Sequence, residues 1–312
     1  MWTFLAALAL ITLFAIAVVR IFLYEYWIQL RLTFHMVLGR TDRALPLVRA
    51  QLERLLRTKG EHHLDTAVAL FQLGQIEYER GRREEGRARV QQAAAFFAQH
   101  QGSQNVIFMA HLEGLAAALN EVELYEQASV VMRRIIDEWR AWKGAQSLQL
   151  GRSLSNLGVV LTRAGQAPDP VTVLEEGLVI QLTHRAESSI EIGIARLNLG
   201  EAYIDVKRFT EAERNLQQAS EVLAKFATQE VGHTFDTYAR LREEQERWAE
   251  AEQLRTSALM AFQRALGENH AEVAKQMEKQ ATLLDRLHRD TERDLYRRKA
   301  KQIREALACS LS

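Results

Sequence analysis

Cysteine and proline are almost missing from this sequence, and each scarcity excludes a class of structure. Among 312 residues there is one cysteine, Cys309, so no disulfide can form within the chain. Only three prolines occur, which favours long helices because proline removes a backbone donor. The net charge is zero, which argues against a dedicated nucleic-acid binder. Since Ala, Leu, Glu, Arg and Gln dominate the composition, the sequence predicts an all-α fold.

The sequence also lacks the short motifs of common active sites and metal centres. It contains no G-x-x-x-x-G-K-[ST], G-x-G-x-x-G, G-x-S-x-G or H-E-x-x-H, and no pair of cysteines. We therefore predict that the protein is not an enzyme and has no catalytic residue, cofactor, metal ion or small-molecule substrate. The densest group of candidate metal ligands, Glu61, His62, His63 and Asp65, is interpreted as a loop or helix cap rather than a metal site.

One long apolar run stands at the start of the chain. Residues 2–19 contain no charged side chain, and the apolar character resumes after Arg20 as far as Tyr24. A helix over residues 2–24 would be about 34 Å long, enough to cross a bilayer with some tilt. We predict that residues 1–24 form an uncleaved transmembrane anchor that contacts lipid through residues 2–24. The alternatives are a signal peptide cleaved at Ala15-Ile16-Ala17 and a buried core helix.

The charges that follow the apolar run predict its orientation. Between Arg20 and Gly60 there are eight basic residues and three acidic ones. Basic residues are enriched on the cytoplasmic side of membrane helices, so this bias places the C-terminal body in the cytoplasm. The same basic stretch could also lie against anionic lipid head groups. The expected localisation is a single-pass membrane protein with a cytoplasmic body.

Small residues recur along the rest of the chain at a nearly fixed interval. They are 42 residues apart, with one interval of 39, at Gly74, Ala116, Gly158, Gly200, Ala239 and Ala281. Two further sets follow them after 12 and 19 residues and are also mostly small: Gly86, Ala128, Pro170, Ala212, Ala251 and Arg293, then Ala93, Ile135, Gly177, Ala219, Ala258 and Ala300. A repeat of this length predicts a helical solenoid, with the small residues at close helix contacts.

The unit over residues 191–230 shows the predicted helix pair most clearly. Its first helix has apolar residues on one side, and the turn falls at Lys207-Arg208. The second helix has apolar residues at steps of three and four: Phe209, Ala212, Leu216, Ala219 and Leu223. Glycines stand seven residues after the small position in three units, where a left-handed turn residue is expected: Gly39, Gly81 and Gly165.

This combination of a Leu-Gly pair, a tyrosine, a basic turn and a Glu-Ala pair resembles the tetratricopeptide repeat. The 42-residue length is similar to that of kinesin light chain repeats, and Gly60-x-x-His63 and Gly267-x-x-His270 resemble the linker of that subfamily. The resemblance covers about residues 25–308. It implies a right-handed α-solenoid of about seven helix pairs, the first and last degenerate, followed by a tail over residues 309–312.

The resemblance further implies that the first helices line a concave groove for a protein or an extended peptide. By their place in the repeat, the predicted groove residues are Phe71, Gln75, Tyr78, Asn120, Arg152, Asn156, Arg163, Asn198 and Glu201. Amides can pair with a peptide backbone, and arginines can bind a carboxylate. The carboxylate clamp of chaperone-binding repeats is not reproduced. Acidic residues predict a groove that turns acidic toward the C-terminus: Asp236, Glu243, Glu244, Glu278 and Asp285.

The expected function is a membrane-anchored interaction scaffold or assembly factor. The alternative is a holdase-like chaperone or quality-control adaptor for membrane or exported proteins. The basic run from Arg286 to Arg304 is interpreted as a solvated face of the last helix pair, with a docking surface as the alternative. Residues 32–58 are predicted to form a degenerate first unit whose first helix continues the membrane helix without a break, because no proline or glycine lies between Trp2 and Leu38.

Overall fold

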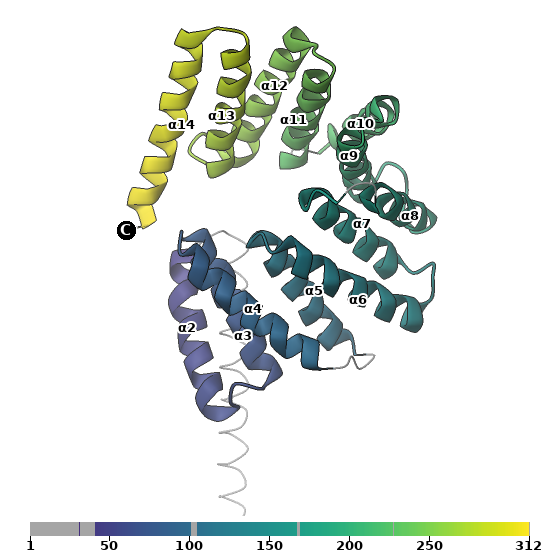
Figure 1. Ribbon diagram of the computed structural model, residues 1–312, viewed down its shortest axis with the longest axis vertical. Coiled ribbons are helices and arrows are strands. Elements are labelled where there is room, and N and C mark those ends of the chain that lie inside the picture. The colour runs from purple at the N-terminus through teal and green to yellow at the C-terminus, as the bar shows by residue number, and fades with distance from the viewer. Residues whose placement is uncertain (1–30, 32–40, 101–104, 167–168, 227, 312) are drawn as a thin grey trace, which may run out of the picture. The chain divides into compact units, whose positions relative to one another are not determined.

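The computed structural model describes residues 31, 41–100, 105–166, 169–226 and 228–311. Within these ranges the chain forms thirteen helices and no strand, so the predicted all-α fold is confirmed (Figure 1). The helices are α2 (Thr41–Thr58), α3 (Leu64–Glu79), α4 (Arg83–Gln99), α5 (Val106–Glu121), α6 (Tyr125–Lys143), α7 (Leu148–Arg163), α8 (Asp169–His184), α9 (Ile190–Asp205), α10 (Phe209–Leu223), α11 (Gln229–Glu244), α12 (Trp248–Leu266), α13 (Ala271–Arg286) and α14 (Asp290–Leu311).

Two of the predicted domain boundaries lie near the ends of the chain. The predicted anchor over residues 1–24 lies outside the described residues, as does the predicted first helix of the degenerate unit before α2. None of the helices in the described ranges combines the length and the apolar character needed to cross a membrane. At the other end, α14 continues to Leu311, so residues 309–311 are helical rather than a separate tail.

The chain divides into two compact units, residues 1–101 with 117–124 and residues 102–116 with 125–312. In the first unit α2 packs against α3, and α3 packs against α4. In the second unit each helix from α6 to α13 packs against the next, and α9 also contacts both α7 and α11. The first helices of successive pairs therefore lie side by side in the second unit.

Close contact between paired helices explains the small residues at the fixed interval. A β-carbon on Gly200 of α9 would lie 2.7 Å from Leu216 Cδ2 of α10, well inside van der Waals contact. On Gly74 of α3 it would lie 2.7 Å from the carbonyl oxygen of Gly86 in α4. The alanines at the equivalent positions are buried: Ala116, Ala239 and Ala281. The predicted packing role of these positions is confirmed.

The turn between paired helices contains one left-handed residue. Gly81 and Gly165 have φ angles of 83° and 69°, which confirms the prediction for these two glycines. In four other units the same position has a φ of 55° to 63° and is not glycine: Glu123, Lys207, Glu246 and His288. A left-handed conformation costs such residues roughly 1–2 kcal/mol. Packing of the helix pair therefore imposes this turn even where the residue disfavours it.

Replacing Glu246 by glycine is expected to raise the free energy of unfolding by about 1 kcal/mol. Glycine relieves roughly 1–2 kcal/mol of left-handed strain, which outweighs its own backbone entropy loss of about 0.5–1 kcal/mol on folding. The change also removes an exposed negative charge just after α11, where the helix dipole disfavours it. Urea unfolding measures the gain. The matched control is Gly165→Ala, at the same turn position, which should lower stability; an unchanged Glu246→Gly midpoint would contradict the expectation.

Histidines cap two of the helices. The backbone N–H of Asp65 donates to Nδ1 of His63 before α3, and the N–H of Glu272 donates to Nδ1 of His270 before α13, each at 3.1 Å. The interpretation of His63 as a cap is thus confirmed. Across the described part of the chain, no three His, Cys, Asp or Glu side chains are grouped so that they could hold a metal ion.

Helix α2 is the second helix of the degenerate first unit. Its buried side chains follow one face: Ala44, Val48, Leu52 and Leu55. The helix lies within the range 32–58 predicted for the degenerate first unit, and its buried residues recur at steps of three and four. The buried face of α2 packs against α3, so the first full repeat is covered on this side.

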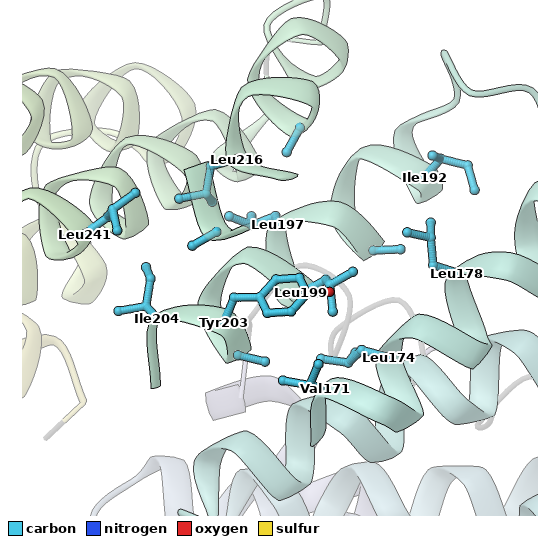
Figure 2. Packing of buried hydrophobic residues seen from close by; sticks show 14 of the residues in the cluster. Val171, Leu174, Leu178, Ile192, Leu197, Leu199, Tyr203, Ile204, Leu216 and Leu241 are labelled. Carbon is cyan, nitrogen blue, oxygen red and sulfur yellow. The ribbon is translucent and has the colours of Figure 1, made fainter. Parts of the chain in front are cut away.

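One hydrophobic cluster joins α8, α9, α10 and α11, which belong to successive helix pairs. Figure 2 shows Leu178 of α8, Leu199 and Tyr203 of α9, and Leu216 of α10 within one cluster. The same cluster includes Leu241 of α11, which belongs to the next pair. Because the cluster crosses from pair to pair, it fixes the register in which the first helices lie beside one another.

Candidate binding face of the first helices

The first helices of the second unit form a face that presents polar side chains. We call the surface of α7, α9, α11 and α13 the first-helix face. Helices α7 and α9 are in contact, and two ionic bridges join α9 to α11 and α11 to α13. Arg240 of α11 donates a hydrogen bond to Glu201 of α9 at 3.4 Å and also ion pairs with Asp205. Lys279 of α13 ion pairs with Asp236 of α11.

Arg255 of the second helix α12 neutralises much of the acidic charge on α11. Its guanidinium ion pairs with Asp236, and its Nε donates to Oε1 of Glu243 at 2.9 Å. The side chains of Arg255 and Asp236 are only 8% and 14% exposed. A buried carboxylate needs such a partner because desolvation of an isolated charge is costly.

The groove predicted to turn acidic toward the C-terminus is therefore corrected by the structure. Asp236 and Glu243 of α11 are paired with Arg255. The two predicted acids of α13 are paired with arginines of α14. Arg293 lies 2.7 Å from Asp285, and Arg304 ion pairs with Glu278. Sequence reasoning assigned these acids to the groove without their basic partners, which come from the second helices. Glu244 of α11 is exposed and has no ion pair with a described residue.

The basic run over residues 286–304 has structural partners. Besides the two contacts of Arg293 and Arg304, Arg289 lies 2.6 Å from Glu252 of α12 and 2.6 Å from Glu292. The contact with Glu252 joins the turn before α14 to helix α12 of the preceding pair. Arg297 and Arg298 are exposed, in agreement with a solvated outer face.

Three predicted groove residues lie on α7 as one exposed polar stripe. Arg152, Asn156 and Arg163 are all exposed, and no described residue forms a hydrogen bond or ion pair with any of them. Asn198 stands at the equivalent place of Asn156 on α9; it is half-buried and likewise without a partner among the described residues. These side chains have unused hydrogen-bonding capacity on a surface built from tightly packed helices.

Four predicted groove residues lie in the first unit. Gln75 of α3 donates a hydrogen bond to Glu121, the neighbour of Asn120 at the end of α5. Tyr78 is half-buried beneath the guanidinium of Arg87, which lies 5.5 Å from the ring centre. The hydrogen bond from Gln75 joins α3 to the end of α5 within the first unit.

One of these four predicted groove residues lies in the core, because it is on the buried side of α3. Phe71 is 5% exposed and belongs to the core of the first unit, so it offers no surface to a ligand. Glu79 lies at the end of the same helix, where partial desolvation and the negative charge of Glu121 raise the pKa of its carboxyl group. Of the two aromatic residues predicted for the groove in this unit, only Tyr78 is partly exposed.

A buried carboxylate in the first unit was missed by sequence reasoning. The side chain of Glu77 in α3 is 3% exposed; Arg49 of α2 lies 3.0 Å from it, and Arg89 of α4 lies 2.6 Å away. Burial alone would raise the pKa of Glu77, but the hydrogen bonds from these arginines and the charge of Arg82 hold it below its usual value. The sequence contains one indication of this buried acid. Glu77 occupies a repeat position that is leucine in three other units, at Leu119, Leu161 and Leu284.

The comparisons with known proteins agree with this architecture. The tetratricopeptide repeat family profile matches residues 33–99. No curated protein matches the chain. A solved structure of kinesin light chain TPR-like repeats from Podosopora anserina is similar with a TM-score of 0.53 and 18% identity, over 62% of this chain and 92% of that one.

Two Rap structures extend the similarity over nearly the whole chain. The apo form of RapI has a TM-score of 0.60 and 12% identity, over 90% of this chain and 98% of RapI. A Rap protein in complex with the competence and sporulation factor has a TM-score of 0.57 and 13% identity, over 92% of this chain and 76% of that one. The fold is thus that of a tetratricopeptide-like helical repeat protein.

Proposed function

We propose that the protein is an interaction scaffold whose first-helix face binds a protein or an extended peptide. The observation that carries the proposal is the stripe of Arg152, Asn156 and Arg163 on α7, which is exposed and unpartnered among the described residues. Asparagine can pair with a peptide backbone through both its donor and its acceptor, and the arginines can bind carboxylates. A Rap protein of similar fold has been solved with the competence and sporulation factor, which supports ligand binding by this architecture.

The proposal includes no enzymatic activity. The described residues of the first-helix face offer arginine, amide and paired carboxylate groups, which suit recognition. Repeat solenoids commonly use an extended face of this kind to bind partners.

The proposal also includes a membrane anchor at residues 1–24 and a cytoplasmic body. The support is the uncharged run over residues 2–19 and the excess of basic residues after it. Protease added to right-side-out membrane vesicles is expected to leave residues 40–312 intact. Extraction by carbonate at high pH should leave the chain in the membrane. Digestion of the body, or its recovery in an exported soluble fraction, would refute this part alone.

Photocrosslinking from intact membranes tests the binding face. A photoreactive amino acid at Asn156 or Asn198 is expected to capture one predominant partner, identified by mass spectrometry. The control site is Arg214, which is exposed on the second helix α10 and has no partner among the described residues. Equal capture from the control site would contradict the proposal. Many unfolded clients, in place of one partner, would favour the holdase-like chaperone.

A further inference from the structure

We infer that α7 selects acidic peptides, and that the preferred ligand carries two carboxylates about five residues apart. The inference rests on the proposed function of the first-helix face and specifies its ligand. Arg152 and Arg163 are the groups that would recognise the two carboxylates, with Asn156 between them. Arginine suits this role because its planar guanidinium can bind a carboxylate through two parallel hydrogen bonds.

Helix geometry sets the spacing of the two charges. Arg152 and Arg163 are eleven residues apart on one helix, which places them about 16 Å apart along the axis and about 20° apart around it. They therefore stand on the same stripe, and Asn156 and Val159 lie between them at the intervening turns. An extended peptide advances about 3.3 Å per residue, so it covers that distance in about five residues.

Apart from Glu244 of α11, the acids of the first-helix face named above are paired within the protein. On α9 and α11, Glu201 and Asp205 are bound by Arg240. Farther along, Asp236 is bound by Arg255 and by Lys279. A ligand that pairs with any of these groups must first displace an internal partner. The arginines of α7 have no internal partner to displace among the described residues. They can therefore bind an acidic ligand directly and set its preferred charge.

The repeat positions equivalent to Arg152 support the same conclusion. On α9 this position holds Ile194, which packs against the hydrophobic core. On α11 it holds His233, whose ring packs edge-on against Phe262 at a centroid distance of 4.8 Å. On α13 it holds Lys275, which lies 3.5 Å from Glu272. Among these four first helices, α7 alone presents an unpaired cation at this position within the described residues.

Glu201 is the acid that opposes this selectivity. On α11, Arg240 stands at the repeat position of Glu201 and reaches back to the preceding first helix. By the same relation we expect Glu201 to lie toward the end of α7 that carries Arg163, while the structure pairs Glu201 with Arg240 at 3.4 Å. Removal of the Glu201 charge should therefore strengthen binding of an acidic ligand.

Fluorescence anisotropy with the full chain in detergent tests the inference. The probe is a fluorescein-labelled decapeptide of Ser, Thr and Val with glutamate at its third and eighth positions. It should bind at least about tenfold more tightly than the same peptide with glutamines, a difference of about 1.4 kcal/mol. A peptide with two adjacent glutamates should bind more weakly than the spaced one. Raised salt should reduce the difference, since exposed charges are screened.

Variants assign the effect to α7. Arg152→Gln and Arg163→Gln should each reduce affinity for the spaced glutamate peptide by about tenfold and leave binding of the glutamine peptide unchanged. Arg152→Glu should shift preference toward a peptide with lysine at one of the two sites. Glu201→Gln should tighten binding of the acidic peptide, and Arg214→Gln is the matched control that should change nothing. Circular dichroism verifies that each variant is folded.

Two results would overturn the inference. One is equal affinity for the glutamate and glutamine peptides; the other is acid-selective binding that survives both Arg152→Gln and Arg163→Gln. If either occurs while Asn156 still crosslinks one partner in membranes, the ligand class is wrong and the proposed binding face stands. If the crosslink at Asn156 fails as well, both are wrong.

Discussion

Arg255→Met should lower the free energy of unfolding by about 3 kcal/mol. Removing one partner of a buried ion pair typically costs about 3–5 kcal/mol, because the remaining charge is left desolvated and unpaired. Asp236 would lose its main partner in a largely buried site, and Glu243 would lose its hydrogen bond from Nε. Lys279 still reaches Asp236, which places the expected loss at the lower end of that range.

Chemical unfolding and hydrogen exchange together measure this loss. Arg264→Met is the matched control, since Arg264 is exposed on the same helix and has no partner among the described residues. It should change stability by less than about 0.5 kcal/mol. Faster exchange should be concentrated in α11 to α13, because a repeat contacts mainly its neighbours. Equal losses for the two variants would show that the charges around Arg255 are not energetically coupled.

Gly200→Leu should destabilise the fourth full repeat by about 2–3 kcal/mol. Already the first carbon of a side chain would approach Leu216 Cδ2 to 2.7 Å, and the carbonyl oxygen of Ala212 lies 3.5 Å from the same point. A leucine must therefore push α9 and α10 apart, and overpacking of this kind costs about 1–3 kcal/mol. The tightness of the contact places the expected value in the upper part of that range.

Thermal unfolding of Gly200→Leu compares directly with Arg214→Leu. Arg214 is exposed on α10, so the same added side chain meets no neighbouring helix there. The double variant Gly200→Leu with Leu216→Ala should recover part of the stability, because it removes the atoms that the new side chain meets. A melting temperature equal to wild type for Gly200→Leu would show that the interval of small residues has another cause.

Features could be predicted from the sequence where a single physical requirement selects the residue type at a position. Gly200 is small because a β-carbon there would overlap Leu216, and His63 precedes α3 because its ring accepts a backbone N–H. Gly81 adopts the left-handed turn for which glycine is suited. Each of these reasons acts within one helix pair, so the spacing in the sequence reveals it.

The features that could not be predicted depend on which side chains of different helices meet in space. Arg255 has the periodicity of an ordinary residue on α12, yet it reaches two acids of α11. Phe71 occupies a position that faces the groove in the repeat resemblance, but in this chain it is buried. The partners of Glu77 come from α2 and α4, which repeat spacing alone does not relate to α3.

The bridges between first helices have a mechanical consequence. Arg240 ties α9 to α11 and Lys279 ties α11 to α13, so sliding or splaying of these helices must break an ion pair. Within the described residues α7 and α9 are in contact, but no ion pair joins them. In the part of the chain that the structure describes, the joint that borders the arginine stripe therefore lacks the ion pair that braces the neighbouring first helices. An extended ligand bound there would serve as the missing cross-brace, so its arrival should stiffen the array and slow hydrogen exchange in α7 and α9.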